Sequence, residues 1–318
     1  MFDIKNEVLL AENRIRSFIR ETPLDYSLAL SKMTSSNVYL KCENLQYTTA
    51  FKTRGALNKL LSLTPQQCAL GVVAASTGNH GTAVAFGLNK LNLSGIVFVP
   101  EYASSTKVDA IRNYDVPVEF YGSDCVLTEI HALNYAKEHN KVYISPYNDK
   151  QVIGGQGTIA IELLRQLTKI DVVLVPIGGG GLISGIAGYL KVFSPTTKII
   201  GCLPENSPVM YESIKAGHIV EMETQPTLSD ATAGGIEPNA ITFEICQQLV
   251  DDYILVSEQE IKNAIILLLK THHYLIEGAA GLALASLLKN AEQFRDKNVV
   301  VVLSGANMSV ETLKKVLN

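Results

Sequence analysis

The sequence predicts an α/β protein built from two doubly wound, mostly parallel sheets. Two observations support this: short runs rich in β-branched residues alternate with helical patterns of roughly 10–15 residues, and most of these runs are continuously apolar, as in parallel strands covered on both faces. The runs divide into one set before about residue 148 and one after it. The expected strands are 38–43, 72–76, 94–100, 118–122, 142–146, 171–178, 198–204, 252–257 and 298–305.

Composition limits the classes of protein to consider. The 318 residues are 47% hydrophobic and 18% charged, enough for a sizeable core in one large or two medium domains. The net charge is −4 and Lys and Arg are scattered, so no nucleic-acid partner is expected. The apolar runs are too short for a membrane span of about 20 residues. Five cysteines without a CxxC pair disfavour a zinc site, and their odd number, with no signal-peptide pattern, favours the cytoplasm.

The N-terminal segment predicts an amphipathic helix docked on the rest of the chain. Its apolar residues fall on one helical stripe. These are Val8, Leu9, Ile15, Phe18 and Ile19.

A glycine-rich loop, GGGGLISG at 178–185, follows the apolar run DVVLVPI and opens a helical pattern. Successive glycines allow backbone N–H groups to turn toward an anion, and the helix N-terminus adds partial positive charge. We therefore expect a phosphate-binding loop. A Walker loop is excluded because Ile186 follows Gly185.

The same loop leaves a dinucleotide-binding alternative open. The GxGxxG pattern lacks its third glycine, because Ile183 and Ser184 occupy that place. Glu205 nevertheless lies near the end of the next predicted strand, where an acid would bind a ribose. A nicotinamide-dependent oxidoreductase is therefore the alternative from a different class.

Three further segments follow predicted strands, where α/β proteins bind ligands. In AFKTRGA (50–56), Lys52 is a candidate covalent amine, although most lysines are solvated surface groups. In ASTGNHG (75–81), hydroxyl, amide and imidazole groups surround Gly78 at a predicted helix start, which suits either a carboxylate site or a helix cap. In VVVVLSGAN (299–307), Ser304 faces either a ligand cleft or a turn.

Taken together, the motifs resemble the fold-type II pyridoxal-phosphate family, which includes threonine and serine dehydratases and serine racemase. The matching segments run nearly end to end in the family's order: TPL (22–24), KxExxQxT (41–48), FKTRGA (51–56), STGNHG (76–81), GGQGT (154–158), GGGG (178–181), IEGAAG (276–281) and SGAN (304–307). The resemblance implies a tryptophan synthase β-like fold, with a large domain at 1–48 and 147–318 and a small domain at 49–146. It also implies a homodimer.

The resemblance also implies a role for each matching residue. Lys52 would bind pyridoxal 5'-phosphate covalently and act as the catalytic base. The implied cofactor contacts are Phe51, Lys52, Asn79, Gly178, Gly179, Gly180, Gly181, Leu182 and Ser304. The implied contacts to the substrate carboxylate are Ser76, Thr77, Asn79 and His80.

The dehydratase and racemase branch fits best, because FKTRG and GNHG resemble that branch rather than the cysteine and threonine synthases. The expected reaction is β-elimination from an L-hydroxy amino acid such as L-threonine or L-serine, giving a 2-oxo acid and ammonia. Residues 230–252 most resemble bacterial dehydratases that include those of hydroxyectoine breakdown, so a 3-hydroxyaspartate-type substrate stays open. Racemisation also stays open, because Thr77 keeps a catalytic hydroxyl where serine racemase has a serine. Residues 123–142 argue against it, because they contain no arginine where serine racemase has one facing the substrate.

The sequence departs from the family pattern at several positions. Ala50 replaces a serine before the lysine, and Ala306 replaces a glycine. Leu203 and Val209 stand where related enzymes have metal-binding carboxylates, so no metal is expected. The chain ends soon after Ser304, so the regulatory domain of biosynthetic threonine dehydratases is not expected.

Overall fold

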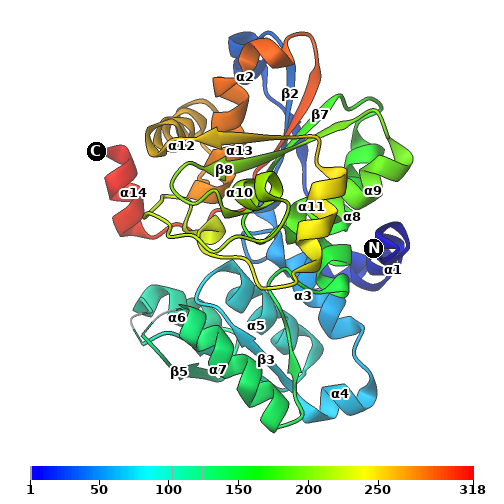
Figure 1. Ribbon diagram of the computed structural model, residues 1–318, viewed down its shortest axis with the longest axis vertical. Coiled ribbons are helices and arrows are strands. Elements are labelled where there is room, and N and C mark those ends of the chain that lie inside the picture. Colours follow the sequence, from blue (N-terminus) through cyan, green and yellow to red (C-terminus); the bar gives the residue numbers. More distant parts are fainter. Residues whose placement is uncertain (1, 102, 124) are drawn as a thin grey trace.

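The computed structural model describes residues 2–101, 103–123 and 125–318. Within these residues the strands form two sheets, one of six strands in the order β1-β2-β10-β7-β8-β9 and one of four in the order β5-β4-β3-β6 (Figure 1). All neighbouring strands are parallel except β1, which runs antiparallel to β2. The predicted α/β class with two mostly parallel sheets is confirmed.

Each of the nine predicted segments contains a strand, although most strands are shorter than predicted. The larger sheet contains β1 Leu24–Tyr26, β2 Asn37–Lys41, β7 Val172–Pro176, β8 Lys198–Pro204, β9 Asp252–Val256 and β10 Asn298–Val302. The smaller contains β3 Val72–Ala75, β4 Gly95–Val99, β5 Val118–Phe120 and β6 Val142–Tyr143. Strand β1 was not predicted, because three residues are too few to show a period.

Helices cover both faces of the larger sheet. The helices of the described chain, including those around the smaller sheet, are α1 Ile4–Ile15, α2 Leu28–Thr34, α3 Lys52–Leu61, α4 Pro65–Leu70, α5 Asn79–Leu91, α6 Ser105–Arg112, α7 Cys125–Glu138, α8 Lys150–Gln166, α9 Gly181–Phe193, α10 Val209–Ala216, α11 Ile241–Leu249, α12 Glu258–His272, α13 Gly278–Lys289 and α14 Val310–Leu317. Along β7, Val173 and Val175 join the core beneath α8 and α9, while Val172 and Leu174 join the core beneath α12 and α13. Burial on both faces explains why the strand is continuously apolar.

Helix α1 docks as predicted, except at one position. Val8 and Ile15 are fully buried, and Ile19 beyond the helix is also buried. The prediction for Leu9 was wrong, because its side chain is 39% exposed. Successive helical residues are about 100° apart, so Leu9 cannot share the buried stripe centred on Val8.

Helices α3 and α8 pack at near backbone contact. A Cβ atom on Gly155 would lie 2.5 Å from the carbonyl oxygen of Arg54, and one on Gly55 would lie 2.8 Å from that of Val152. The glycines of FKTRGA and GGQGT therefore allow this close packing. This packing places Lys52, the first residue of α3, beside the segment that leads into α8.

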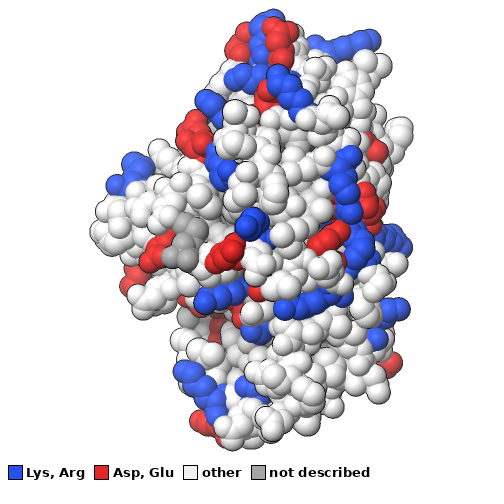
Figure 2. All heavy atoms as spheres, turned by 90° about the vertical axis from the view of Figure 1, so that its right-hand side faces the viewer, with Lys and Arg blue, Asp and Glu red and all other residues white. Residues whose placement is uncertain are grey.

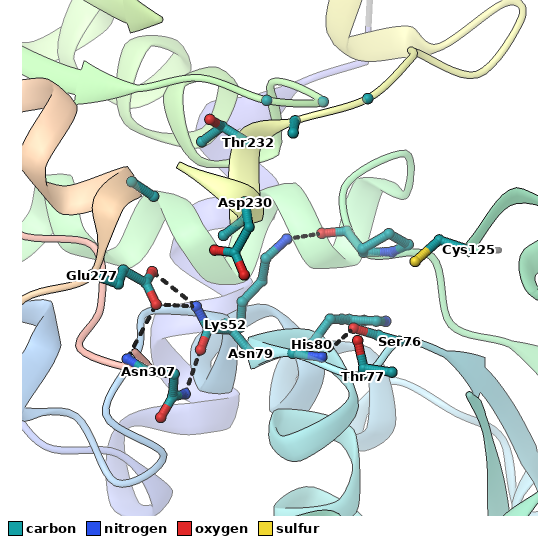
Figure 3. A pocket seen from close by; sticks show the side chains of 18 of the residues that line it. Lys52, Ser76, Thr77, Asn79, His80, Cys125, Asp230, Thr232, Glu277 and Asn307 are labelled. Atoms are coloured by element: carbon teal, nitrogen blue, oxygen red, sulfur yellow. Dashed lines mark hydrogen bonds between the residues drawn. The ribbon is translucent and has the colours of Figure 1, made fainter. Parts of the chain in front are cut away.

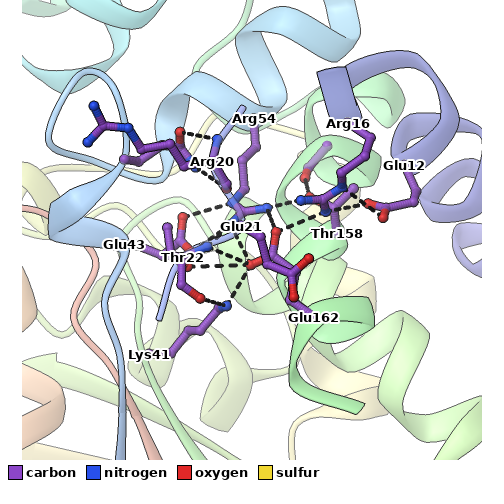
Figure 4. A network of polar contacts seen from close by, with 12 residues as sticks. Glu12, Arg16, Arg20, Glu21, Thr22, Lys41, Glu43, Arg54, Thr158 and Glu162 are labelled. Atoms are coloured by element: carbon purple, nitrogen blue, oxygen red, sulfur yellow. Dashed lines mark hydrogen bonds and ion pairs between the residues drawn. The ribbon is translucent and has the colours of Figure 1, made fainter. Parts of the chain in front are cut away.

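A buried network of charged side chains also fixes α3 (Figure 4). The Arg54 guanidinium donates two hydrogen bonds of 2.8 Å to Glu43 and bonds of 2.7 and 2.9 Å to Glu162. Lys41 donates to Glu162 at 2.5 Å, and these side chains are completely buried. Burial would raise the pKa of Glu162, but Arg54 and Lys41 outweigh it and lower the pKa to about 2.

On the face shown in Figure 2, Lys and Arg side chains intermix with Asp and Glu rather than forming a basic patch. None of the helices in the described part of the chain has both the length and the apolar character needed to cross a membrane.

Candidate active site

A cavity of about 400 Å³ lies at the carboxyl ends of strands from both sheets. Its walls include residues 76–80 after β3, residues 178–182 after β7 and Ser304 after β10. Phe51 and Lys52, at the start of α3, line it too (Figure 3). The structure thus brings all the predicted site residues to one cavity, in the position expected for an α/β protein.

Lys52 extends its amine into this cavity. Its Nζ atom donates a 2.6 Å hydrogen bond to the Pro146 carbonyl and lies 5.2 Å from the centre of the Phe51 ring. Burial lowers the pKa of Lys52 to about 8, although the negative charges of Glu277 and Glu129 partly oppose the shift. The amine therefore has a larger neutral, nucleophilic fraction near neutral pH than an exposed lysine has.

The glycine loop combines open N–H groups with close packing. Gly180 has a φ of +85° and caps α9, while a Cβ atom on Gly179 would lie 2.4 Å from the Tyr147 ring. A Cβ atom on Gly178 would lie 2.9 Å from the Cα atom of Thr232. Within the described residues, the N–H groups of 178–181 donate to no protein acceptor. The loop can therefore bind a phosphate at the positive end of a helix.

Ser304 provides a buried polar atom that no protein group in the described part of the chain satisfies. Its Oγ atom is buried and has no hydrogen-bond partner within the described part of the chain. Its carbonyl accepts a 3.0 Å hydrogen bond from the Phe51 N–H, and Ala50 forms an antiparallel bridge with Gly305. An unsatisfied buried hydroxyl is costly, so a ligand nitrogen at this place would compensate for it. Ser304, Lys52 and the glycine loop together fit pyridoxal phosphate.

The segment after β3 forms the N-terminal end of α5. Ser76 accepts a 3.1 Å hydrogen bond from the Gly78 N–H, and Thr77 lines the cavity. The His80 Nε2 atom lies 2.9 Å from the Ile144 carbonyl. Burial and the charge of Lys52 lower the pKa of His80 to about 3, so its ring is neutral. Because the ring bonds to the backbone of Ile144, the group of His80 that can bind an anion is its backbone N–H.

The sequence model of the family described as "Pyridoxal-phosphate dependent enzyme" matches residues 15–305. The chain belongs to this family. This pyridoxal-phosphate enzyme is 37% identical over 310 residues to an L-threonine ammonia-lyase of Thermotoga maritima, covering 97% of this chain and 76% of that protein. It is 39% identical over 311 residues to the catabolic L-threonine dehydratase TdcB of Staphylococcus aureus, covering 96% of this chain and 90% of that one.

Solved structures show the same fold. Isoform 2 of threonine deaminase from Solanum lycopersicum has a TM-score of 0.95 and 34% identity, covering 99% of this chain and 87% of that one. Maize serine racemase has a TM-score of 0.93 and 29% identity, covering 98% and 96%. The predicted family is confirmed, in preference to the nicotinamide-dependent alternative.

The pyridoxal-phosphate enzyme has polar residues in its cavity that sequence reasoning missed. Asn79 Nδ2 donates to both carboxylate oxygens of Glu277, and the Asn307 N–H donates to the same carboxylate at 3.2 Å. Burial raises the pKa of Glu277 to about 7 against the opposing effect of these hydrogen bonds. The motifs IEGAAG and SGAN contain Glu277 and Asn307, so the information was present in the sequence. Glu129, which also lines the cavity, belongs to no motif.

One ion pair joins two parts of the cavity wall. The Lys107 Nζ atom, on α6, lies 3.1 Å from Asp230 Oδ2, on the 3₁₀ turn Asp230–Thr232. Both residues line the cavity that also contains Lys52. Access to Lys52 is therefore bordered by charges of both signs.

The positions considered for a metal have other partners. Leu203 and Val209 are buried in the apolar core. Glu205 accepts a hydrogen bond of 3.2 Å from Lys289. Across the described ranges, no group of three or more His, Cys, Asp or Glu side chains is placed to hold a metal ion.

Proposed function

We propose that this enzyme removes water and ammonia from L-threonine or L-serine and releases the corresponding 2-oxo acid. The observation that carries this proposal is the partly neutral amine of Lys52, held in one cavity with a phosphate cradle and an unsatisfied serine hydroxyl. The threonine ammonia-lyase and threonine dehydratase named among its relatives support the same substrate class.

The cofactor contacts follow from the geometry of the cavity. Gly178–Leu182 would hold the phosphate, Phe51 would pack against the ring, and Ser304 would face the ring nitrogen. Asn79, oriented by Glu277, would face the ring hydroxyl. Bound pyridoxal phosphate would withdraw electrons from the substrate and acidify its α-proton.

The protein residues supply positioning and proton transfer. The N-terminal end of α5 would bind the substrate carboxylate through the Ser76 and Thr77 hydroxyls and the N–H groups of Asn79 and His80. The Lys52 amine would remove the α-proton of the substrate as a general base. Ser304 would face the ring nitrogen with a neutral hydroxyl, which would not keep that nitrogen protonated as a carboxylate would, and this would favour prompt loss of the β-hydroxyl.

The test is the activity of Lys52→Ala with L-threonine and L-serine, measured as 2-oxo acid and ammonia. We expect no turnover and no covalently bound cofactor, whereas Lys90→Ala, at an exposed position of α5, is expected to behave as the wild type. Turnover by Lys52→Ala at a rate close to that of the wild type would overturn the proposal.

Racemisation is the second candidate, and Thr77 is the observation that favours it. Its hydroxyl lines the same cavity as Lys52, and a second acid or base is what a racemase requires. Following D-serine against the 2-oxo acid from L-serine separates the two reactions. If racemisation occurs, Thr77→Ala should reduce it more than elimination.

We also propose that residues 49–146 form the small domain and that two copies of the chain form a cytoplasmic dimer without a bound metal. All four strands of the smaller sheet lie between Val72 and Tyr143, which supports the domain division. Sedimentation of the purified protein and metal analysis would test the dimer and the metal.

A further inference from the structure

Glu129 is an acidic residue of the cavity that neither the motifs nor the proposed roles include. It lies on α7, one helical turn after Cys125, and both residues line the cavity. The charge of Glu129 acts on the Lys52 amine, so the two groups lie near each other in this cavity. The Glu129 carboxyl makes no hydrogen bond within the described residues and is half-buried.

The groups around Glu129 favour its protonated form. Burial has the largest effect, the nearby carboxylate of Glu237 adds to it, and the positive charge of Lys52 opposes both, so that the pKa rises to about 7. Glu237 is fixed in place by hydrogen bonds of 2.8 Å from Asn148 and 3.4 Å from Ser145. A large fraction of Glu129 therefore carries a proton near neutral pH.

The hydroxyls of Tyr143 and Tyr147 lie within reach of the charge of Glu129. Burial raises the pKa values of Tyr143 and Tyr147, and the charges of Glu129 and Glu237 add to both shifts. The phenol oxygen of Tyr147 accepts a 2.8 Å hydrogen bond from the Glu237 N–H. Neither phenol competes with Glu129 as an acid at neutral pH, because both hold their protons more tightly.

Loss of a β-hydroxyl requires a proton, because hydroxide is a poor leaving group. Glu277, His80 and Lys107, which also line the cavity, are less suitable donors. Glu277 accepts from Asn79 with both carboxylate oxygens. His80 is neutral and faces the backbone, and Lys107 is paired with Asp230.

We propose that Glu129 is a catalytic acid of the elimination, donating its carboxyl proton to the β-oxygen of the substrate. This inference rests on the proposed function. Lys52 takes the α-proton, and the electron pair of the Cα–H bond forms the Cα=Cβ double bond. The Cβ–O bond breaks with both electrons on oxygen, which takes the Glu129 proton and leaves as water. Glu129 becomes a carboxylate and regains a proton from solvent, to which it is partly exposed.

The test compares leaving groups in the holoenzyme of Glu129→Gln. Glutamine has nearly the same shape but no acidic proton, and chloride leaves without needing one. With L-threonine and L-serine we expect kcat to fall by about 100-fold or more, the usual contribution of general acid catalysis. With β-chloro-L-alanine we expect kcat to stay within about threefold of the wild type, which also shows that the variant is folded and loaded. Glu138→Gln, at an exposed position of the same helix, is the matched control.

The outcomes separate the possible failures. Equal losses with the hydroxyl and chloride substrates would assign Glu129 a structural role, and unchanged turnover of L-serine would place the acid elsewhere; either result overturns the inference. A wild-type enzyme that eliminates chloride but neither hydroxyl substrate would overturn the proposed function, and this inference with it. Independently of activity, the infrared carboxyl band that titrates near pH 7 should be weaker in Glu129→Gln than in Glu138→Gln. An unchanged band would also overturn the inference.

Discussion

The side-chain amide of Asn79 donates hydrogen bonds of 2.9 and 3.0 Å to the two carboxylate oxygens of Glu277. The residues are 198 positions apart and both are buried. Asn79 begins α5 and Glu277 immediately precedes α13, so this pair joins the smaller sheet's helix to the larger sheet's helix at the cavity.

Glu277→Gln should remove a pH dependence of stability. Because folding raises the pKa of Glu277 from 4.5 to about 7, the folded chain binds this proton more tightly than the unfolded chain. Its contribution to stability is therefore fully present below pH 4.5 and is lost as the pH rises toward 7. Between pH 5 and 8, the free energy of unfolding of the apo wild type should fall by on the order of 2 kcal/mol relative to the variant. Urea titrations measure this, with the exposed Glu244→Gln as the control; identical slopes for wild type and Glu277→Gln would contradict it.

Covalent capture of pyridoxal phosphate by the apoenzyme should follow the ionisation of Lys52. The neutral amine is the nucleophile, so the rate should rise through pH 6 and 7 by roughly tenfold per unit. It should level off above the lowered pKa of about 8. Stopped-flow absorbance follows the reaction. A rate that keeps rising past pH 9 would show that Lys52 retains its ordinary value of 10.5.

Gly179→Ala should weaken cofactor binding, because its new methyl group would overlap the Tyr147 ring. Overpacking of this kind costs about 1–3 kcal/mol, which corresponds to a rise of roughly tenfold to a hundredfold in the dissociation constant of pyridoxal phosphate. Gly235→Ala is the matched control, since Gly235 also lines the cavity and a Cβ atom there meets no other atom within 4 Å. Equilibrium titration of both apoenzymes decides the matter, and equal affinities would refute the steric explanation.

Arg54→Met should destabilise the protein strongly, because Glu43 and Glu162 would lose their buried guanidinium partner. Breaking a buried ion pair in this way costs about 3–5 kcal/mol. Arg295→Met removes a guanidinium that also binds one carboxylate with two nitrogens, but at an exposed site, and no measurable change is expected. Urea unfolding of the two variants gives the comparison. A similar small effect for both would mean that Arg54 is dispensable for stability.

The strands were predictable because burial on both faces leaves continuous apolar runs, which are visible in the order of the residues. The glycine loop and Lys52 were predictable because special backbone geometry and covalent chemistry need particular residue types at fixed spacing. Glu129 was not, because a single acid on a helix has no local pattern that distinguishes a cavity wall from a solvated face. The length of β1 and the exposure of Leu9 depend on tertiary packing, which the local periodicity does not contain.

The buried charges beneath α3 impose a constraint on how this sequence can diverge. Replacing only one of Lys41, Glu43, Arg54 and Glu162 leaves an unbalanced charge in the interior, so any change passes through a poorly folding intermediate unless a partner changes with it. Homologues should therefore retain or replace the four as a group. A covariation signal among these positions would identify the set without any reference to catalysis.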